Sequence, residues 1–119
     1  MALWVAEDRE MLTRVHVYNL DGAKIVVGAN TIVEVSHAKV NVPRLRWVLS
    51  RVRVEPVTES AATAAANLLK KAGLHGHKYA IDATVAEMAL RQTGPVAMLT
   101  SDVDDMRRLC GDRVHLIPV

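Results

Sequence analysis

The stretch Val96-Ala-Met-Leu-Thr-Ser-Asp-Val-Asp-Asp-Met106 decides the fold class of this chain. Its first half is a short apolar run, which is typical of a buried strand, and its second half is the acid-rich start of a helix. A strand that leads through a short turn into a helix is the repeating unit of a parallel sheet. Because Asp102 follows the strand, we expect it at the carboxyl edge of the sheet, where open α/β sheets bind ligands.

Two other segments place an acid in the same way. A strand predicted at 24–28 leads into a helix that carries Glu34, and a helix predicted at 79–92 carries Asp82 near its start. Carboxylates that converge from distant segments repel one another, and a hard divalent cation such as Mg²⁺ removes that repulsion and takes oxygen ligands. The sequence therefore predicts a cation site formed by Glu34, Asp82 and Asp102.

Helices and strands broadly alternate along the rest of the chain, which predicts a single three-layer α/β/α domain over residues 1–119 with a mostly parallel sheet. Strands are expected at 24–28, 51–57, 95–99 and 113–118. Helices are expected at 3–18, around Glu34, and at 43–50, 59–72, 79–92 and 103–110. Thr58 should cap the 59–72 helix and Gly73 should end it, while Asn30 or Thr31 should cap the helix of Glu34.

Composition narrows the function classes. The 119 residues are 50% hydrophobic but only 3% aromatic, which argues against a protein that stacks bases on an aromatic platform. A net charge of +2 permits an RNA partner without requiring one. Cys110 is the only cysteine, so no intrachain disulfide can form, and a reducing cytoplasmic location is expected. No run reaches the roughly 20 apolar residues of a membrane span.

Three segments together resemble a known family. The segment Tyr79 to Ala89 (YAIDATVAEMA), followed by the 96–106 stretch, resembles the second half of a PIN domain, the family that includes the VapC-type toxins of bacterial toxin–antitoxin pairs. Val27 to Val35 (VGANTIVEV) resembles the strand, turn and helix that carry the glutamate of that family. The resemblance covers nearly the whole chain, and it rests on three weak motifs that occur in the expected order.

The resemblance implies a Mg²⁺- or Mn²⁺-dependent endoribonuclease that acts on RNA and pairs with an antitoxin protein. The metal ligands would be Glu34, Asp82 and Asp102. Asp105 would be an auxiliary acid. Either of two hydroxyl side chains, Thr100 or Ser101, would orient a carboxylate or a metal-bound water.

The N-terminus departs from the family pattern. A PIN domain begins with a central strand that ends in an aspartate, whereas this chain opens at Met1 with the helix predicted over 3–18. We therefore expect an N-terminally incomplete domain without its first strand and first acid. Exposed strand edges invite pairing with another chain, which predicts a homo-oligomer. Two further possibilities are a degenerate, non-catalytic module that binds protein or RNA, and a truncated product of a longer PIN protein.

Each acid also has a structural interpretation. Glu34 follows Thr31 at the spacing of a capping box. Asp82 lies near a predicted helix start, where the helix dipole stabilises any carboxylate. Asp102 or Ser101 could cap the helix that follows them.

Basic residues outside the acidic group give a second candidate surface. Arg44 and Arg46 belong to a basic run between a helix and the next strand, and with Lys78 they could contact an RNA backbone. A solvated face is the alternative. His75 and His77 lie in one predicted loop, but the sequence offers no further ligands at zinc-site spacing.

Overall fold

The computed structural model describes residues 3–6, 24–36, 42–93, 95–100 and 102–118. Within these residues, five strands form one sheet in the order β3-β2-β1-β4-β5, and every neighbouring pair is parallel. The strands are β1 (Leu3–Ala6), β2 (Lys24–Gly28), β3 (Arg53–Glu55), β4 (Val96–Thr100) and β5 (His115–Pro118). The helices are α2 (Ala29–Val35), α3 (Val42–Ser50), α4 (Glu59–Ala72), α5 (Gly76–Leu90) and α6 (Val103–Cys110).

The central strand of the sheet comes from the N-terminus. β1 pairs on both sides, with Leu3 opposite Lys24 of β2 and opposite Val96 of β4. The predicted helix over 3–18 is therefore wrong at its start, and its later residues lie outside the described part of the chain. The predicted loss of the first strand is also wrong, and the empty slot that suggested pairing with another chain is filled. A central parallel strand is buried on both faces and reads as an uninterrupted apolar run. A short apolar run of this kind is equally compatible with a buried helix.

Local signals at the helix ends explain most of the other elements. The predicted bounds of α4 are confirmed, since the Thr58 hydroxyl accepts a hydrogen bond from the Ala61 N–H at 3.1 Å and Gly73 ends the helix at φ 68°. The left-handed region costs glycine nothing sterically, which suits it to this position. α5 begins earlier than predicted, but Tyr79 interrupts it with φ −113° and ψ 18°, so the predicted start is a kink inside the helix.

The helix that carries Glu34 begins without a loop. β2 runs directly into α2, and Gly28 occupies the N-cap position with extended backbone and no side-chain cap. The predicted caps at Asn30 or Thr31 are therefore wrong, because both residues lie inside the helix. For the same reason the spacing of Thr31 and Glu34 does not form a capping box.

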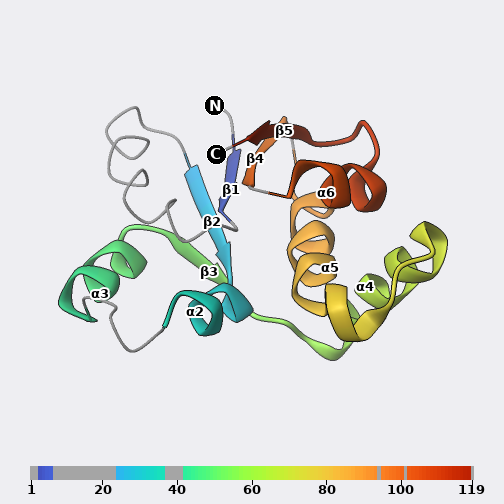
Figure 1. Ribbon diagram of the computed structural model, residues 1–119. Coiled ribbons are helices and arrows are strands. Elements are labelled where there is room, and N and C mark those ends of the chain that lie inside the picture. The colour runs from blue at the N-terminus through green and yellow to red at the C-terminus, as the bar shows by residue number, and fades with distance from the viewer. Residues whose placement is uncertain (1–2, 7–23, 37–41, 94, 101, 119) are drawn as a thin grey trace.

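The helices lie on both sides of the sheet. Figure 1 shows α4, α5 and α6 together on one side and α3 on the other. The core on the α5 side is aliphatic, and its largest fully buried members include Met88, Met98 and Met106. Every residue of β4 is buried, and the small side chains of Ala83 and Ala86 are buried on α5. Of the helices described, none is both long and apolar enough to cross a lipid bilayer.

Candidate functional site

The register of the sheet brings three strand ends to one edge. Ala6 of β1 lies opposite Val27 of β2 and opposite Leu99 of β4. The chain leaves this edge through α2 after β2 and through α6 after β4. The residues that follow Ala6 in the sequence are Glu7 and Asp8, which lie outside the described residues. An acid therefore follows each of the three strands in the sequence, and all three strands end at the edge where α/β proteins bind ligands.

The turn from β4 to α6 positions the backbone of Asp102. Thr100 is fully buried, and its hydroxyl oxygen accepts a hydrogen bond from the Asp102 N–H at 3.0 Å. Asp102 occupies the N-cap position of α6 with φ −111° and ψ 57°, but its side chain makes no capping hydrogen bond. The capping interpretation of the Asp102 side chain is therefore wrong. Ser101, the other predicted cap, lies outside the described residues.

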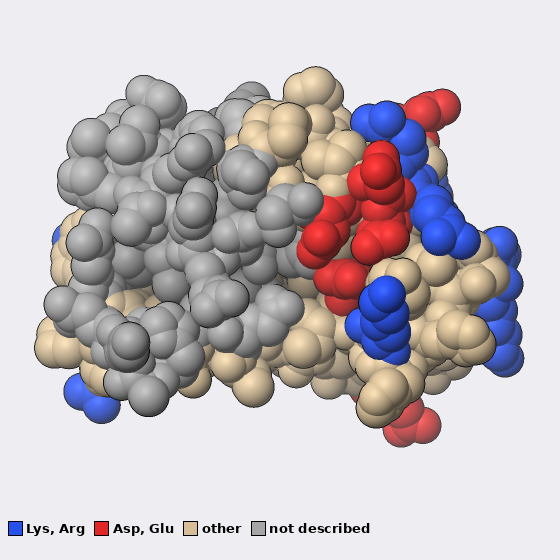
Figure 2. All heavy atoms as spheres, viewed as in Figure 1, with Lys and Arg blue, Asp and Glu red and all other residues tan. Residues whose placement is uncertain are grey.

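Acidic side chains gather where α6 begins. Asp104 and Asp105 lie in the first turn of α6, directly after Asp102, where the positive end of the helix dipole stabilises them. Asp104 is exposed and Asp105 is half-buried, and neither forms an ion pair with another described residue. Figure 2 shows this acidic face of the molecule over α5 and α6. The face concentrates acidic side chains, and basic side chains border it (Figure 2).

Asp82 and Glu34 belong to two helices that contact each other. Asp82 is half-buried on α5, three residues after the Tyr79 kink, and α5 packs against both α2 and α6. The backbone of Glu34 lies in α2, and its side chain is not among those described. Among the described side chains, no group of three His, Cys, Asp or Glu is placed to hold a metal ion. The described acids alone do not complete the predicted cation site, which stays a prediction.

The structure contains a second group of carboxylates that the sequence did not predict as a site. Glu55, at the end of β3, and Glu87, on α5, are 7% and 8% exposed. Arg91 lies between them, because its Nε donates to Glu87 Oε1 at 3.1 Å and Oε2 at 3.0 Å and its Nη1 donates to Glu55 Oε2 at 3.3 Å. Arg53 Nη2 lies 2.6 Å from Glu55 Oε1, in an ion pair without hydrogen-bond geometry. We call these four residues the Arg91 network.

The Arg91 network balances its own charge. It contains two carboxylates and two guanidinium groups, so no further cation is needed to neutralise it. Burial lowers the pKa of Arg91, but its hydrogen bonds and charge interactions with Glu87 and Glu55 outweigh burial and raise that pKa. The Glu87–Arg91 half was visible in the sequence as an i, i+4 pair on a helix. The pairing of Glu55 with Arg91 could be recognised only from the tertiary structure, because the two residues are distant in sequence.

The candidate RNA-contact residues lie on separate elements. Arg46 is exposed on α3, whereas Lys78 is exposed on α5 with its Nζ 5.3 Å from the centre of the Tyr79 ring. Figure 1 places α3 and α5, the helices that carry these two residues, on opposite sides of the sheet. The side chain of Arg44 is not described. His75 and His77 are exposed at the start of α5.

Comparisons with known proteins bear on the fold. No family model matches this chain, and no curated protein matches it. A chain in the crystal structure of VapBC2 from Rickettsia felis bound to a DNA fragment from their promoter is similar, with a TM-score of 0.68 and 16% sequence identity. The match covers 100% of this chain and 99% of that chain. At this low identity the likeness concerns architecture, and the chain has a PIN-like α/β fold of the VapC kind.

Proposed function

We propose that this protein is a PIN-type, metal-dependent endoribonuclease and the toxin of a toxin–antitoxin pair. One observation carries the proposal: in a PIN-like fold, three parallel strands end at one edge, and an acid follows each of them. Glu34 follows β2 and Asp102 follows β4, while α5, which packs on both following helices, carries Asp82. Glu7 and Asp8 follow β1 in the sequence.

The recovered central strand changes the proposed set of acids. The family pattern places its first acid directly after the central strand, and β1 is that strand. We therefore assign the first acid to Glu7 or Asp8, which immediately follow Ala6 in the sequence. The protein then has a candidate for every acid of the pattern.

The other roles follow from the residues at the edge. A bound Mg²⁺ or Mn²⁺ would offset the charge that builds on the scissile phosphate. Glu34, Asp82 and Asp102 would hold that ion, and Asp105 would be the auxiliary acid. The Thr100 hydroxyl oxygen accepts a hydrogen bond from the backbone N–H of Asp102, and this bond fixes the turn that carries the aspartate.

The test is cleavage of a fluorescent single-stranded RNA with Mg²⁺ or Mn²⁺, with and without EDTA. The Asp82→Asn/Asp102→Asn double variant should lose activity by on the order of 100-fold or more, because it removes two carboxylates that would hold the metal ion that offsets the charge on the reacting phosphate. The matched control is Glu59→Gln/Asp112→Asn, which removes the same charge from two exposed acids on other elements. Equal cleavage by the parent and the double variant would contradict the proposal.

A group of exposed apolar side chains favours a second function, association with a partner protein. Most exposed is Val33 on α2, at 71%, and Trp47 on α3 is 41% exposed. The exposed large hydrophobic residues among those described all come from α2, α3, β3 and the segment after β3: Val33, Val42, Trp47, Val54 and Val57. Contiguous apolar patches mark protein interaction sites, and we propose that these side chains form one. The partner would be an antitoxin-like protein or a second copy of the chain, and the structure from R. felis is itself a complex.

Light scattering of the purified chain tests the second copy. If the patch joins two copies, the parent should be a dimer and Val33→Arg/Trp47→Arg should be a monomer. The matched control is Ala62→Arg, a charge added at an exposed position of α4. A monomeric parent at all concentrations would contradict self-association, and this outcome is independent of the ribonuclease test.

A further inference from the structure

A pocket lies on the face formed by α4 and α5, apart from the acid-bearing edge. Its volume is about 300 Å³, and Arg113, in the turn before β5, is among the residues that line it. Leu68 and Leu90 supply an apolar surface, and Asn67 adds an amide that can both donate and accept hydrogen bonds. This volume lies near the lower end of the roughly 300–1,000 Å³ of small-molecule sites. The pocket therefore suits a small ligand with an apolar body.

The Arg91 network builds one wall of this pocket. Glu87 and Arg91 both line it, and Arg91 is hydrogen-bonded to Glu87 and Glu55 at once. The two carboxylates fix the guanidinium and neutralise it, so this wall is ordered but contributes little net charge. The net charge of the pocket comes from its other ionic side chains.

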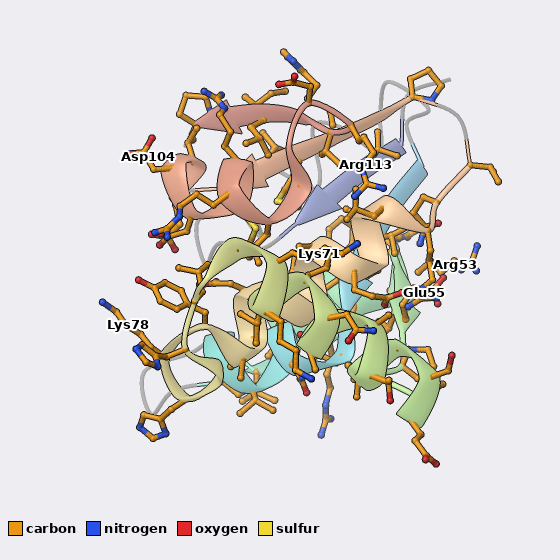
Figure 3. All side chains as sticks on the ribbon, turned by 90° about the vertical axis from the view of Figure 1, so that its right-hand side faces the viewer. Arg53, Glu55, Lys71, Lys78, Asp104 and Arg113 are labelled. Atoms are coloured by element: carbon orange, nitrogen blue, oxygen red, sulfur yellow. The ribbon has the colours of Figure 1, made fainter. Side chains whose placement is uncertain are left out.

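Those side chains are Lys71 and Arg113, and both are cationic. Lys71 lies in the last turn of α4, which Gly73 ends, and Arg113 lies in the turn after α6, where Gly111 adopts φ 62°. Neither forms an ion pair with another residue in the described ranges. Figure 3 shows both on the face turned toward the viewer, with their charged ends extending into the same region above α5. The helix dipole accounts for a lysine at the end of α4, but it does not account for Arg113.

We propose that this pocket binds a small phosphate monoester with a flat or apolar body, such as a nucleoside monophosphate. A phosphate monoester carries about −1.5 to −2 charges at pH 7, which matches two cations better than a single carboxylate does. Its phosphate lies between Lys71 and Arg113, and its body lies on Leu68 and Leu90 beside the Asn67 amide. The proposal does not depend on the acids at the sheet edge.

The test is a calorimetric titration of the full chain with 5′-AMP, adenosine and inorganic phosphate. AMP should bind more tightly than either fragment, because only AMP has both the charge and the body. Lys71→Gln/Arg113→Gln should weaken AMP binding by on the order of 100-fold, since it removes two hydrogen bonds to a charged group. The matched control, Lys70→Gln/Arg107→Gln, removes two exposed cations that do not line the pocket and should bind AMP like the parent.

Each result decides the proposal. Loss of AMP binding in the pocket variant alone supports it. Absence of AMP binding by the parent, equal losses in both double variants, or phosphate binding as tight as AMP binding would overturn it. Circular dichroism of the pocket variant confirms that a loss does not come from unfolding.

A phosphate monoester can be a free nucleotide or the end of an RNA chain. Two more titrations distinguish these sources, using one short RNA with a 5′-phosphate and the same RNA with a 5′-hydroxyl. Tighter binding of the phosphorylated RNA than of AMP identifies a chain end as the ligand, and the reverse order identifies the free nucleotide. Either order, with loss in the Lys71→Gln/Arg113→Gln variant, supports a phosphate monoester site.

Discussion

Two groups of carboxylates lie in this small domain, and their surroundings are opposite. In the Arg91 network, Glu55 and Glu87 are buried and share Arg91, while Arg53 adds a second cation. On the acidic face, Asp104 is exposed, and no described cation pairs with it. The same chemical group therefore appears once with its countercharge built into the fold and once without it.

The difference indicates which carboxylates serve the fold. A carboxylate can be buried only when a partner replaces the water it loses, and the guanidinium of Arg91 does so for two of them. Asp104 and Asp105 form no ion pair with another described residue, and they follow a strand that ends at the ligand-binding edge of the sheet. We therefore expect stability to depend on the Arg91 network and activity to depend on the acidic face.

The largest effect on stability is expected from Arg91→Met. This variant keeps the aliphatic bulk but leaves two buried carboxylates without their shared partner, and the free energy of unfolding should fall by about 3 kcal/mol. Urea denaturation followed by circular dichroism measures the loss. Arg107→Met, at an exposed position in the last turn of α6, is the control and should cost less than about 0.5 kcal/mol. Equal stability of Arg91→Met and the parent would contradict the expectation that stability depends on the Arg91 network.

A smaller loss is expected from Glu55→Gln. The amide keeps the shape and can still accept a hydrogen bond, and Arg91 retains Glu87 as a partner. The expected cost is about 2 kcal/mol, the range for hydrogen bonds to charged groups. The same urea experiment measures it. A loss larger than that of Arg91→Met would show that Glu55, rather than Arg91, is the centre of the network.

The effect of added metal on the free energy of unfolding tests the acidic face. If the acids bind Mg²⁺ in the folded state only, free Mg²⁺ at about ten times its Kd should stabilise the parent by about 1.4 kcal/mol. The Arg91→Met variant should gain as much, because its acidic face is intact, whereas Asp82→Asn/Asp102→Asn should gain less. Thermal unfolding with MgCl₂ and with matched NaCl measures the difference. Equal shifts in the two salts for the parent would mean that no specific site exists.

The sequence predicted those elements whose signals are local. Thr58 and Gly73 mark both ends of α4, and its predicted bounds are confirmed. The sequence predicts a helix where β1 lies, because apolar residues from Trp4 to Tyr18 recur at helical spacing and the strand partners β2 and β4 are distant in sequence. A strand is defined by its neighbours, so four apolar residues alone could not specify this one.

The same distinction applies to the sites. The position of Asp102 after a strand was readable, because the apolar run and the helix start adjoin it in sequence. The ion pair of Glu55 with Arg91 joins residues 36 positions apart and could not be read from spacing. Pairing between the partners of a buried charge is a tertiary property, whereas the placement of an acid at a strand end is largely a local one.

Two neighbouring acids on the acidic face should show the smallest effects on stability and should differ in their effects on activity. Asp104→Asn and Asp105→Asn each remove a charge from the first turn of α6, so each should cost about 0.5 kcal/mol through the helix dipole. Their effects on RNA cleavage should differ, because Asp105 is half-buried and is the proposed auxiliary acid, whereas Asp104 is exposed. Measured together, urea denaturation and cleavage rates should show equal small losses of stability and a loss of activity only in Asp105→Asn. If Asp104→Asn lost activity instead, the auxiliary role would pass to Asp104, and burial would be the wrong guide to function on this face.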